Sequence, residues 1–401
     1  MARELTQPAA ASSLDPLLER ELEALRARGL GRSLRTVERD GDTLSVDGRS
    51  VVDFSSNDYL ALGRDRRVIA AAREALERHG AGAAASRSLA GTTPCHDEVE
   101  AELAQLYGAP AALAFSSGYA ANVGTLSALA HEGDVVYSDA SNHASIIDGC
   151  RLARARVRVF PHADLDALDR MLAAEPAGVG RRIVVVEGVY SMDGDLYPLP
   201  DLITVARRRE AAIYLDDGHA AGVLGPDGAG TAAHFGAAGE VEVTLATLGK
   251  SFGGAGGAII GSATLRELLL NRARSFIFST GMPPAVAAGV AEAVRISRAE
   301  PWRRERLRAN GLRLRGGLAD LGWRVPERLA GHIVPLVIGD PDDTIRLGER
   351  LLAAGFLVAA VRPPTVPPGS SRLRLTVSAA HADEQIDGLL SALGAPPEPR
   401  A

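Results

Sequence analysis

Short apolar segments alternate with helical patterns through the middle of the chain, and this feature limits the possible folds more than any other. The segments lack the polar alternation expected of a strand that has one solvated face. Parallel strands covered by helices on both faces have this composition. The sequence therefore predicts an α/β fold with a mostly parallel central sheet. The apolar segments are ALAF at 112–115, VVY at 135–137, IVVVE at 183–187, AAIYL at 211–215 and VTLAT at 243–247.

The two ends of the chain differ from this middle part. Leucines recur at helical spacing from Leu14 to Arg28, which predicts an amphipathic leading helix. After Pro283 and Pro284, an Arg/Ala/Leu pattern predicts one long helix over about 285–318, followed by the strands and helices of a smaller domain. We therefore expect an N-terminal helix and arm at 1–50, a large domain at 51–284 and a small C-terminal α+β domain at 285–401.

The overall composition excludes several classes of protein. Hydrophobic residues make up 46% of the 401 residues and the net charge is −6, so the chain is an ordinary globular protein without a broad basic surface for nucleic acid. Cys95 and Cys150 are too few for a zinc cluster or a disulfide framework, so we expect reduced thiols, no metal and a cytoplasmic location. The start, MARELTQPAAASSLD, has no apolar segment of signal-peptide length, and no later run reaches the length of a membrane span.

Lys250, in TLGKSFGGAGG at 247–257, is the only lysine among 44 basic residues. Arginine can replace lysine as a surface charge, but its guanidinium stays protonated and cannot act as an amine nucleophile. The GKS at this position does not complete a nucleotide phosphate loop, because the required earlier glycine is Thr244. The alternative chemistry is a covalent link between the amine and an aldehyde cofactor such as pyridoxal phosphate (PLP). The alternative is that an arginine-rich chain retained this one lysine by chance.

Pyridoxal phosphate would also need a carboxylate for its ring nitrogen, and the sequence offers one after a predicted strand. Asp216 follows AAIYL directly, with His219 three residues later. Ligands of open α/β sheets collect beyond the carboxyl ends of the strands. A carboxylate about 4 Å from a ring N–H contributes roughly 4 kcal/mol at an effective dielectric constant near 20, enough to keep the pyridine protonated. Taken alone, an aspartate here could equally be a helix N-cap.

Candidates for the phosphate and the ring face follow other predicted strands. In AFSSGYAAN, Gly118 begins a helix whose backbone N–H groups suit an anion, although a plain strand-to-helix turn has the same letters. In SDASNHASIIDG, His143 offers a planar ring for stacking, although most single loop histidines have no such role. EGVYSMDGD brings Glu187 and Ser191 to the same edge. Together these residues favour one shared cofactor site.

The chain resembles the α-oxoamine synthases through a set of motifs that occur in the same order, from about residue 20 to 393. This resemblance implies the aspartate-aminotransferase fold (fold type I), PLP as cofactor and a homodimer with its active site at the subunit interface. Within the family, RPPTVPPGSSRLRL and HIVPLVIGD are most similar to the biotin-pathway member. The motifs are SSNDYL, FSSGYAAN, SNHASIIDG, EGVYSMDGD, YLDDGHAAG, TLGKSFGGAGG and RPPTVPPGSSRLRLTVSAAH.

The resemblance also implies roles for individual residues. Lys250 would bind the cofactor aldehyde and later transfer a proton, Asp216 would pair with the ring nitrogen, and His219 would bond the ring phenolate oxygen. His143 would stack on the ring, and Arg374 would bind the amino-acid carboxylate. The other implied cofactor contacts are Gly118, Tyr119, Ser191, Thr247 and Thr280, with Thr280 reaching the neighbouring subunit, and the other implied substrate contacts are Asn57, Thr365 and Arg32.

The implied reaction joins L-alanine to a pimeloyl thioester, carried on coenzyme A or acyl carrier protein, with loss of CO2. One departure concerns the acyl substrate: the arginine expected in GLGRSLR falls on Gly31 in an ungapped alignment, while Arg32 is adjacent. A family member that uses glycine or serine with another acyl thioester, a non-catalytic partner subunit and a generic aminotransferase are the alternatives. Arg372 and Arg374 lie on one face of the predicted strand RLRLTV, where they could also be two solvated arginines on an edge strand.

Overall fold

The computed structural model describes residues 14–40, 43–176 and 178–396. The chain forms two compact units: the smaller unit contains the chain up to Ser55 together with Pro335–Leu375, and the larger unit contains Ser56–Val334 together with the chain from Thr376 on. The division of the sequence at 50 and 284 stays a prediction. The segment MARELTQPAAASS, on which the expected absence of a signal peptide partly depends, lies outside the described residues.

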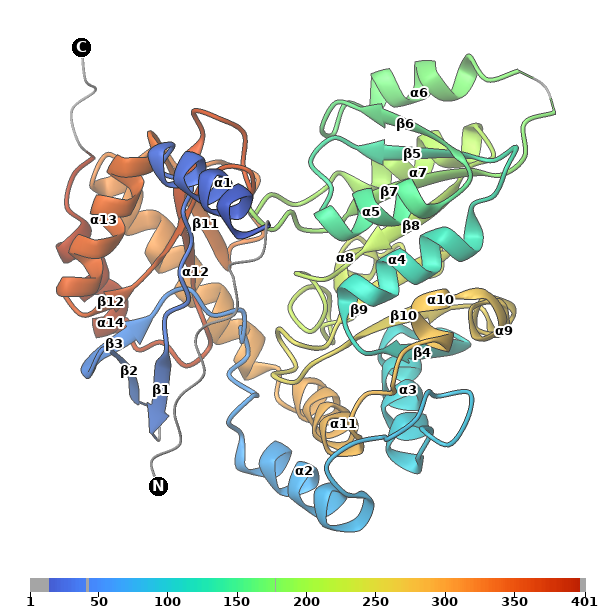
Figure 1. Ribbon diagram of the computed structural model, residues 1–401, viewed down its shortest axis with the longest axis horizontal. Helices are drawn as coiled ribbons and strands as arrows, with labels where there is room; N and C mark the ends of the chain where they lie inside the picture. The colour runs from blue at the N-terminus through green and yellow to red at the C-terminus, as the bar shows by residue number, and fades with distance from the viewer. Residues whose placement is uncertain (1–13, 41–42, 177, 397–401) are drawn as a thin grey trace, which may run out of the picture. The chain divides into compact units, whose positions relative to one another are not determined.

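The larger unit is built on a seven-stranded sheet with strand order β4-β10-β9-β8-β7-β5-β6 (Figure 1). Neighbouring strands from β6 to β9 pair in parallel, and β10 runs antiparallel to both β4 and β9. The predicted mostly parallel sheet is therefore confirmed. The strands are β4 (Ala111–Phe115), β5 (Val135–Asp139), β6 (Arg156–Phe160), β7 (Arg182–Glu187), β8 (Ala212–Asp216), β9 (Val243–Thr247) and β10 (Gly257–Gly261).

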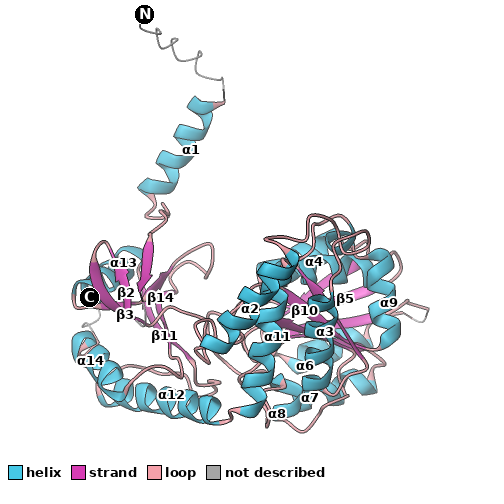
Figure 2. Cartoon of the chain, turned by 90° about the horizontal axis from the view of Figure 1, so that it is seen from below, coloured by secondary structure: helices cyan, strands magenta, loops and turns pink. Residues whose placement is uncertain are grey.

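Helices enclose this sheet, as Figure 2 shows for the strands in magenta. The helices of the larger unit are α2 (Arg66–His79), α3 (Pro94–Tyr107), α4 (Gly118–Leu129), α5 (Ala144–Leu152), α6 (Leu165–Ala173), α7 (Leu199–Arg208), α8 (Gly230–His234), α9 (Ala263–Arg272), α10 (Arg274–Ile277), α11 (Pro284–Ala299), α12 (Trp302–Asp320) and α14 (Asp383–Leu393), of which α12 and α14 pack against each other.

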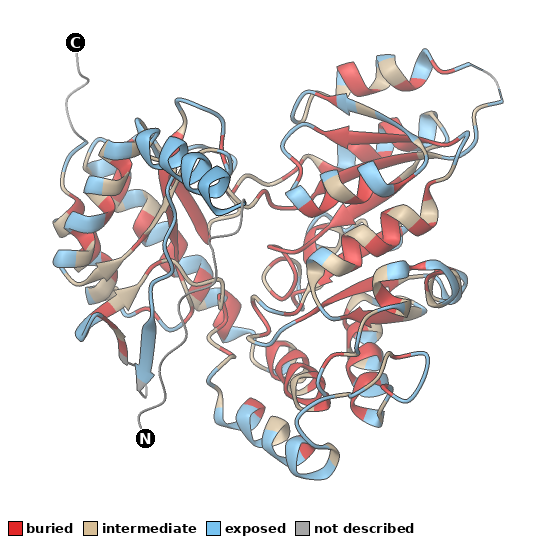
Figure 3. Ribbon diagram, in the orientation of Figure 1, coloured by how far each residue is buried: buried red, intermediate tan, exposed pale blue. Residues whose placement is uncertain are grey.

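Both faces of the sheet are covered, which explains why its strands lack polar alternation. Alternate residues of β7 enter two different cores: Val185 packs in the core that contains Leu126 of α4, and Val184 in the core that contains Leu168 of α6. Because successive side chains of a strand point to opposite faces, a strand buried on both sides must be apolar throughout. Figure 3 shows these central strands as buried.

Two elements differ from the sequence expectations. The single helix predicted over 285–318 is wrong, because the chain forms α11 and α12 with a break at Glu300 and Pro301. Proline removes a backbone donor and disfavours helical geometry in the residue before it, so Pro301 ends one helix and precedes the next. Strand β6 was not expected; it forms the edge of the sheet, and Arg156, Val157 and Val159 in its sequence RVRVF are exposed.

The smaller unit contains two sheets of short strands. One has the order β1-β2-β3-β12 and the other the order β11-β14-β13. Arg372 and Arg374 lie in β14, the middle strand, and each is only 5% exposed. This burial excludes the solvated edge strand as an explanation for the pair. The elements are α1 (Asp15–Ala27), β1 (Val37–Asp40), β2 (Thr43–Val46), β3 (Arg49–Asp53), β11 (Ile333–Gly339), α13 (Pro341–Ala353), β12 (Phe356–Leu357), β13 (Ala359–Val361) and β14 (Ser371–Thr376).

Neither cysteine forms a disulfide: Cys95 and Cys150 are both free and buried. Among the described residues, no helix combines the length and the apolar character needed to cross a membrane.

Candidate active site

Three neighbouring strands of the larger unit have polar residues at their carboxyl ends. Glu187 ends β7, Asp216 ends β8 and Thr247 ends β9, and Glu187 pairs in register with Asp216. Lys250 follows Thr247 in the turn between β9 and β10. Parallel strands therefore bring together carboxyl, hydroxyl and amine groups from residues far apart in the sequence.

The surroundings of Gly218 show how closely these groups approach one another. A β-carbon placed on Gly218 would lie 2.8 Å from Asp216 Oδ1, 2.8 Å from Thr247 Oγ1 and 3.1 Å from Lys250 Nζ. Three polar atoms from three segments thus converge on the space beside one glycine. The predicted meeting of the lysine amine with the carboxylate of Asp216 is present in the structure.

Helix α4 begins next to this cluster. Its N-cap, Ser117, accepts a hydrogen bond from the backbone N–H of Ala120, and a β-carbon on Gly118 would lie 3.0 Å from Thr247 Oγ1. On its other side, Gly118 approaches Gly257 so closely that a side chain on Gly257 would collide with the Gly118 backbone. The first turn of α4 therefore presents backbone N–H groups beside Thr247, as an anion site requires.

His143 is the N-cap of α5 and lies near the same charges. Its backbone N–H donates to Glu187 Oε1 at 2.6 Å, and its ring Nδ1 lies 2.7 Å from Ser145 Oγ. Desolvation by the surrounding protein lowers the pKa of His143, and the Lys250 charge acts in the same direction while Asp216 opposes it. The outer part of the residue stays exposed, so a neutral imidazole is available for stacking.

Two buried carboxyl groups flank Asp216. Burial raises the pKa of Glu187 well above its ordinary value, and the nearby charge of Asp216 adds to this effect. Burial also raises the pKa of Asp217 to about 7, although Thr231 stabilises the carboxylate through hydrogen bonds. Both raised pKa values favour neutral carboxyl groups on the two neighbours of Asp216.

His219 is buried and hydrogen-bonded through its ring. Its Nδ1 lies 2.7 Å from the hydroxyl of Tyr59, a fully buried side chain that also donates to Asn57 Oδ1 at 3.0 Å. The Tyr59 ring packs edge-on against His332 with ring centroids 4.4 Å apart. Tyr59 thus connects two residues predicted to act in the site, His219 and Asn57, and fixes the orientation of the His219 ring.

Three further predicted cofactor contacts lie on the larger unit. Tyr119 is 47% exposed and its hydroxyl donates to Asp148, which raises the pKa of the phenol. Ser191 lies in the turn after β7, between the bridged residues Val189 and Leu196. Thr280 is exposed and forms an isolated bridge with Ser86. Their roles toward a cofactor stay predictions.

The predicted substrate residues of the smaller unit form a second group. Arg32 Nη2 donates to Thr365 Oγ1 at 3.0 Å, and both residues are exposed. The guanidinium of Arg362 donates to the carbonyl oxygens of Gly29 and Gly31, which fixes the backbone that leads into Arg32. The structure therefore brings Arg32 to Thr365, although the ungapped alignment places the family arginine on Gly31.

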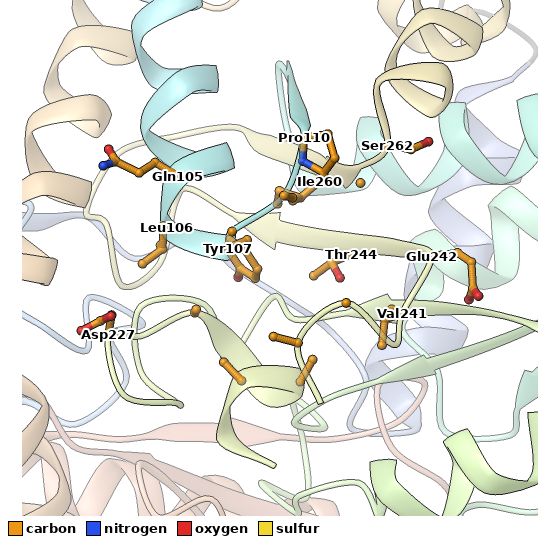
Figure 4. A pocket seen from close by; sticks show the side chains of 18 of the residues that line it. Gln105, Leu106, Tyr107, Pro110, Asp227, Val241, Glu242, Thr244, Ile260 and Ser262 are labelled. Atoms are coloured by element: carbon orange, nitrogen blue, oxygen red, sulfur yellow. The ribbon is translucent and has the colours of Figure 1, made fainter. Parts of the chain in front are cut away.

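A cavity of about 680 Å³ lies elsewhere in the larger unit (Figure 4). Its lining includes Tyr107, Glu242, Thr244 and Ile260, and none of the predicted site residues. Thr244 lies near the start of β9, whereas Lys250 follows the end of that strand. The cavity therefore lies at the amino end of strand β9, whereas the candidate active site lies at its carboxyl end.

His162 anchors the loop that carries Ser191. Its Nδ1 bonds Asp139 and its Nε2 bonds Asp195, each at 2.9 Å. Burial alone would lower the pKa of His162, but the hydrogen bonds to the two carboxylates outweigh it and raise the pKa to about 10. Because the unfolded pKa is near 6.5, this contribution to stability is complete below about pH 6.5 and is lost as the pH rises toward 10.

We therefore expect the free energy of unfolding of the wild type to fall more steeply than that of His162→Gln between pH 6.5 and pH 10, in urea titrations. His234→Gln is the control, since His234 is exposed and forms no ion pair within the described residues. Parallel pH profiles for the wild type and His162→Gln would contradict the expectation.

Some residues of the site were not identified from the sequence. Asn122, Ser145 and Tyr59 lie within the motifs FSSGYAAN, SNHASIIDG and SSNDYL but were given no role. Asn122 has a usable signal: it is a polar residue four positions after Gly118, on the same face of a helix start that is otherwise small and apolar. Tyr59 has no such signal, because its contacts depend on segments distant in sequence.

Known proteins match almost the whole chain. The family model for aminotransferase class I and II matches residues 49–393. The 8-amino-7-oxononanoate synthase of Methylococcus capsulatus is 48% identical over 374 residues, which cover 93% of this chain and 96% of the relative. The same enzyme of an Anaeromyxobacter species is 46% identical over 387 residues, which cover 95% of this chain and 96% of the relative.

Solved structures agree with this relationship. Serine palmitoyltransferase from S. paucimobilis, with bound PLP and myriocin, has a TM-score of 0.90 and 33% identity over 96% of this chain and 98% of its own. The 8-amino-7-oxononanoate synthase of Francisella tularensis has a TM-score of 0.74 and 25% identity over 86% of this chain and 96% of its own. The fold is thus that of the fold-type I PLP-dependent transferases, and the resemblance to the α-oxoamine synthases is confirmed. The chain belongs to the aminotransferase class I and II family.

Proposed function

We propose that the protein is an acyltransferase that condenses L-alanine with a pimeloyl thioester, giving 8-amino-7-oxononanoate, CO2 and free thiol in biotin biosynthesis. The observation that carries the proposal is the convergence of Lys250 Nζ, Asp216 Oδ1 and Thr247 Oγ1 around Gly218. Relatives with this activity, 46–48% identical over nearly the whole chain, support the same assignment. The presence of the amine and the carboxylate together favours an enzyme over a non-catalytic partner subunit.

The residues at this edge of the sheet fit pyridoxal phosphate. The cofactor needs an amine, a carboxylate, an anion cradle and a ring-stacking group, and these are Lys250, Asp216, the first turn of α4 and His143. Gly218 supports the fit, because any side chain there would fill the space on which the amine and carboxylate converge. When bound, PLP withdraws electrons from the α-carbon of the amino acid, and this makes loss of the α-proton possible.

Each protein group has a distinct task in the proposed reaction. Asp216 keeps its negative charge next to the ring nitrogen, while Lys250 Nζ exchanges a proton with the amino-acid α-carbon. Lys250 must be neutral for this step, and a nearby positive charge on the bound substrate lowers the pKa of an amine. His219 is held by Tyr59 through Nδ1, and donation from Nε2 to the ring oxygen requires the tautomer in which the Tyr59 hydroxyl donates to Nδ1 rather than to Asn57.

Arginines of the smaller unit are proposed to bind the substrate carboxylates. Arg374 is 5% exposed on a central strand, where a planar guanidinium can bind a carboxylate through two hydrogen bonds. Arg32, next to Thr365, is proposed to bind the distal carboxylate of the pimeloyl chain. Alanine and the pimeloyl chain each have one free carboxylate, so each substrate requires one arginine.

We further propose that the enzyme is a cytoplasmic homodimer. Helix α1 contains no buried residue, and its leucines Leu18, Leu22 and Leu25 are 43%, 47% and 41% exposed. A helix of 13 residues is marginal alone in water, so its apolar side needs a covering surface. A second copy of the chain would supply that surface and would place Thr280 near its active site.

The test is a steady-state assay with single amino acids and defined acyl thioesters. We expect turnover with alanine and pimeloyl thioester, and Arg32→Ala to raise KM for pimeloyl thioester by roughly 10-fold or more, as for loss of one charge-assisted hydrogen bond. With heptanoyl thioester, which lacks the distal carboxylate, KM of the variant should equal that of the wild type. Arg35→Ala is the control, because Arg35 is an exposed neighbour that pairs with Glu349.

Two results would contradict parts of this proposal. Turnover with glycine or serine but not alanine would assign the chain to another reaction of the same family. An equal rise in KM for both thioesters in Arg32→Ala would remove Arg32 from recognition of the distal carboxylate.

A further inference from the structure

Asn122 lies at the centre of the buried hydrogen bonds around Asp216. Its side-chain Nδ2 donates to Asp216 Oδ2 at 2.7 Å and to Ser145 Oγ at 2.9 Å, and its Oδ1 accepts from the Tyr214 hydroxyl at 2.7 Å. An asparagine amide has two N–H donors and one carbonyl oxygen, so each of its polar groups is used here. Asn122, Ser145 and Tyr214 are each 1% exposed or less, so water cannot replace these bonds.

These bonds also fix which way the amide points. Burial raises the pKa of Tyr214 well above its ordinary value, so the phenol keeps the proton that it donates to Asn122 Oδ1. The opposite amide orientation would place the carbonyl oxygen against Asp216 Oδ2 and leave both oxygens without a donor. The carboxylate and the phenol therefore enforce a single orientation in which the amide N–H groups face Asp216 and Ser145.

The second oxygen of Asp216 has a different partner. Asp216 Oδ1 accepts from the backbone N–H of Gly218 at 2.8 Å and lies on the side of Lys250 Nζ and Thr247 Oγ1. Asn122 thus binds Oδ2, whereas Oδ1 is the oxygen near the space beside Gly218. Hydrogen bonds donated to both oxygens fix the orientation of the Asp216 carboxyl group.

A second chain of bonds leads from Asn122 to His143. Ser145 Oγ accepts a hydrogen bond from Asn122 Nδ2, so its own hydroxyl can donate a hydrogen bond to His143 Nδ1, 2.7 Å away. The backbone N–H of Ser145 also donates to His143 Nδ1, at 3.2 Å. Because Nδ1 accepts two hydrogen bonds, the proton of the neutral imidazole is on Nε2.

We propose that Asn122 is a positioning residue that holds Asp216 as an oriented carboxylate and, through Ser145, keeps the proton of His143 on Nε2. Asn122 lies one turn after Gly118 on α4, so one helix supplies both the anion cradle at its N-terminus and this amide. The part of the inference that concerns the cofactor ring depends on the proposed function. The part that concerns His143 can be tested without cofactor.

The test replaces Asn122 by leucine, which has a similar volume and no polar atoms. We expect the Kd for PLP to rise roughly 10- to 100-fold, as for loss of a hydrogen bond to a charged group. We also expect the ring nitrogen of ¹⁵N-labelled PLP in Asn122→Leu to lose its proton at a lower pH than in the wild type. In the cofactor-free protein, ¹⁵N shifts of His143 should show the Nε2–H tautomer in the wild type and a mixture of tautomers in the variant.

Asn142 provides the matched control. It is also buried, its Nδ2 donates to Ser138 Oγ at 2.9 Å and to the Val185 carbonyl at 2.7 Å, and its Oδ1 accepts from the Tyr190 hydroxyl at 3.2 Å. Asn142→Leu therefore loses the same set of buried bonds, none of them to a carboxylate. It should lower the free energy of unfolding without changing the protonation of the PLP ring nitrogen.

Asn122→Asp is the second test variant, for use if Asn122→Leu does not fold. A protonated aspartic acid at this position can donate to Asp216, whereas an ionised one repels it, so PLP affinity should fall more steeply with rising pH than in the wild type. Wild-type PLP affinity and ring-nitrogen titration in Asn122→Leu, or an Nδ1–H tautomer of His143 in the wild type, would overturn the proposal. If the wild type binds PLP but does not condense alanine with pimeloyl thioester, that result would contradict the proposed function and not the role of Asn122.

Discussion

Lys250→Arg is expected to lower turnover by at least about 10⁴-fold while the protein stays folded. Proton transfer by a positioned side chain contributes about 10² to 10⁴-fold, and the covalent link to the aldehyde adds to this because a guanidinium cannot form it. Lys250 is half-buried in a turn, where arginine retains the positive charge but not the free amine. The measurement is kcat with alanine and pimeloyl thioester, with circular dichroism as the check on folding.

The amine can then be restored chemically at the same position. Lys250→Cys treated with 2-bromoethylamine carries an amine at nearly the same distance from the backbone, and the two native cysteines are buried and 8% exposed or less. We expect the treatment to recover activity in Lys250→Cys and to leave the wild type unchanged. Recovery of activity with ethyl bromide, which adds no amine, would exclude the proposed role.

The uniqueness of this lysine also makes the adduct simple to locate. After borohydride reduction of the PLP-saturated protein, peptide mapping should find the pyridoxyl group on Lys250, because the chain has no other lysine. Wild-type turnover in Lys250→Arg would remove the amine from the mechanism.

Asp216→Asn is expected to lower turnover by about 10³-fold. A carboxylate about 4 Å from the ring nitrogen contributes roughly 4 kcal/mol at an effective dielectric constant near 20, and this free energy corresponds to about three factors of ten in rate. Asparagine has the same shape and can still accept the N–H of Gly218, but its NH2 group then faces Asn122 Nδ2, so the loss combines the missing charge with one broken hydrogen bond. The measurement is kcat/KM for alanine, together with the pH at which the PLP ring nitrogen loses its proton.

Asp217→Asn is the matched control for this variant. Asp217 is the adjacent residue, is fully buried and accepts the backbone N–H of Thr231 at 2.9 Å. Its pKa is raised to about 7, mainly by burial, so a neutral amide resembles the form that is present for much of the time at neutral pH. We expect kcat/KM to fall less than about tenfold, and equal losses at the two positions would contradict a specific role for the Asp216 charge.

The sequence predicted the central sheet and the strand-end residues because both depend on local patterns. Strands buried on two faces must be apolar throughout, and the chemistry of Lys250 and Asp216 is visible from their residue types and their places after such strands. The break at Pro301 was missed because the Arg/Ala/Leu composition continues on both sides of a proline that stops the helix.

Other features could not be predicted because they arise only when distant segments meet. The bond between Tyr59 and His219 joins residues 160 positions apart, and Asn122 and Asp216 are 94 positions apart. No local spacing indicates such pairs. The raised pKa of Glu187 likewise depends on complete burial and on the register that places it beside Asp216, neither of which a single sequence specifies.

The reversal of direction at β10 has a consequence for how the lysine moves. The nine residues between β9 and β10 are clamped at both ends, because Thr247 pairs with Gly257 and the Leu248 N–H donates to the Gly256 carbonyl. Within this turn, Gly253 N–H donates to the Lys250 carbonyl at 2.8 Å. The backbone at Lys250 is thus held in place. The amine can change bonding partners only by rotation about the bonds of its four-carbon side chain.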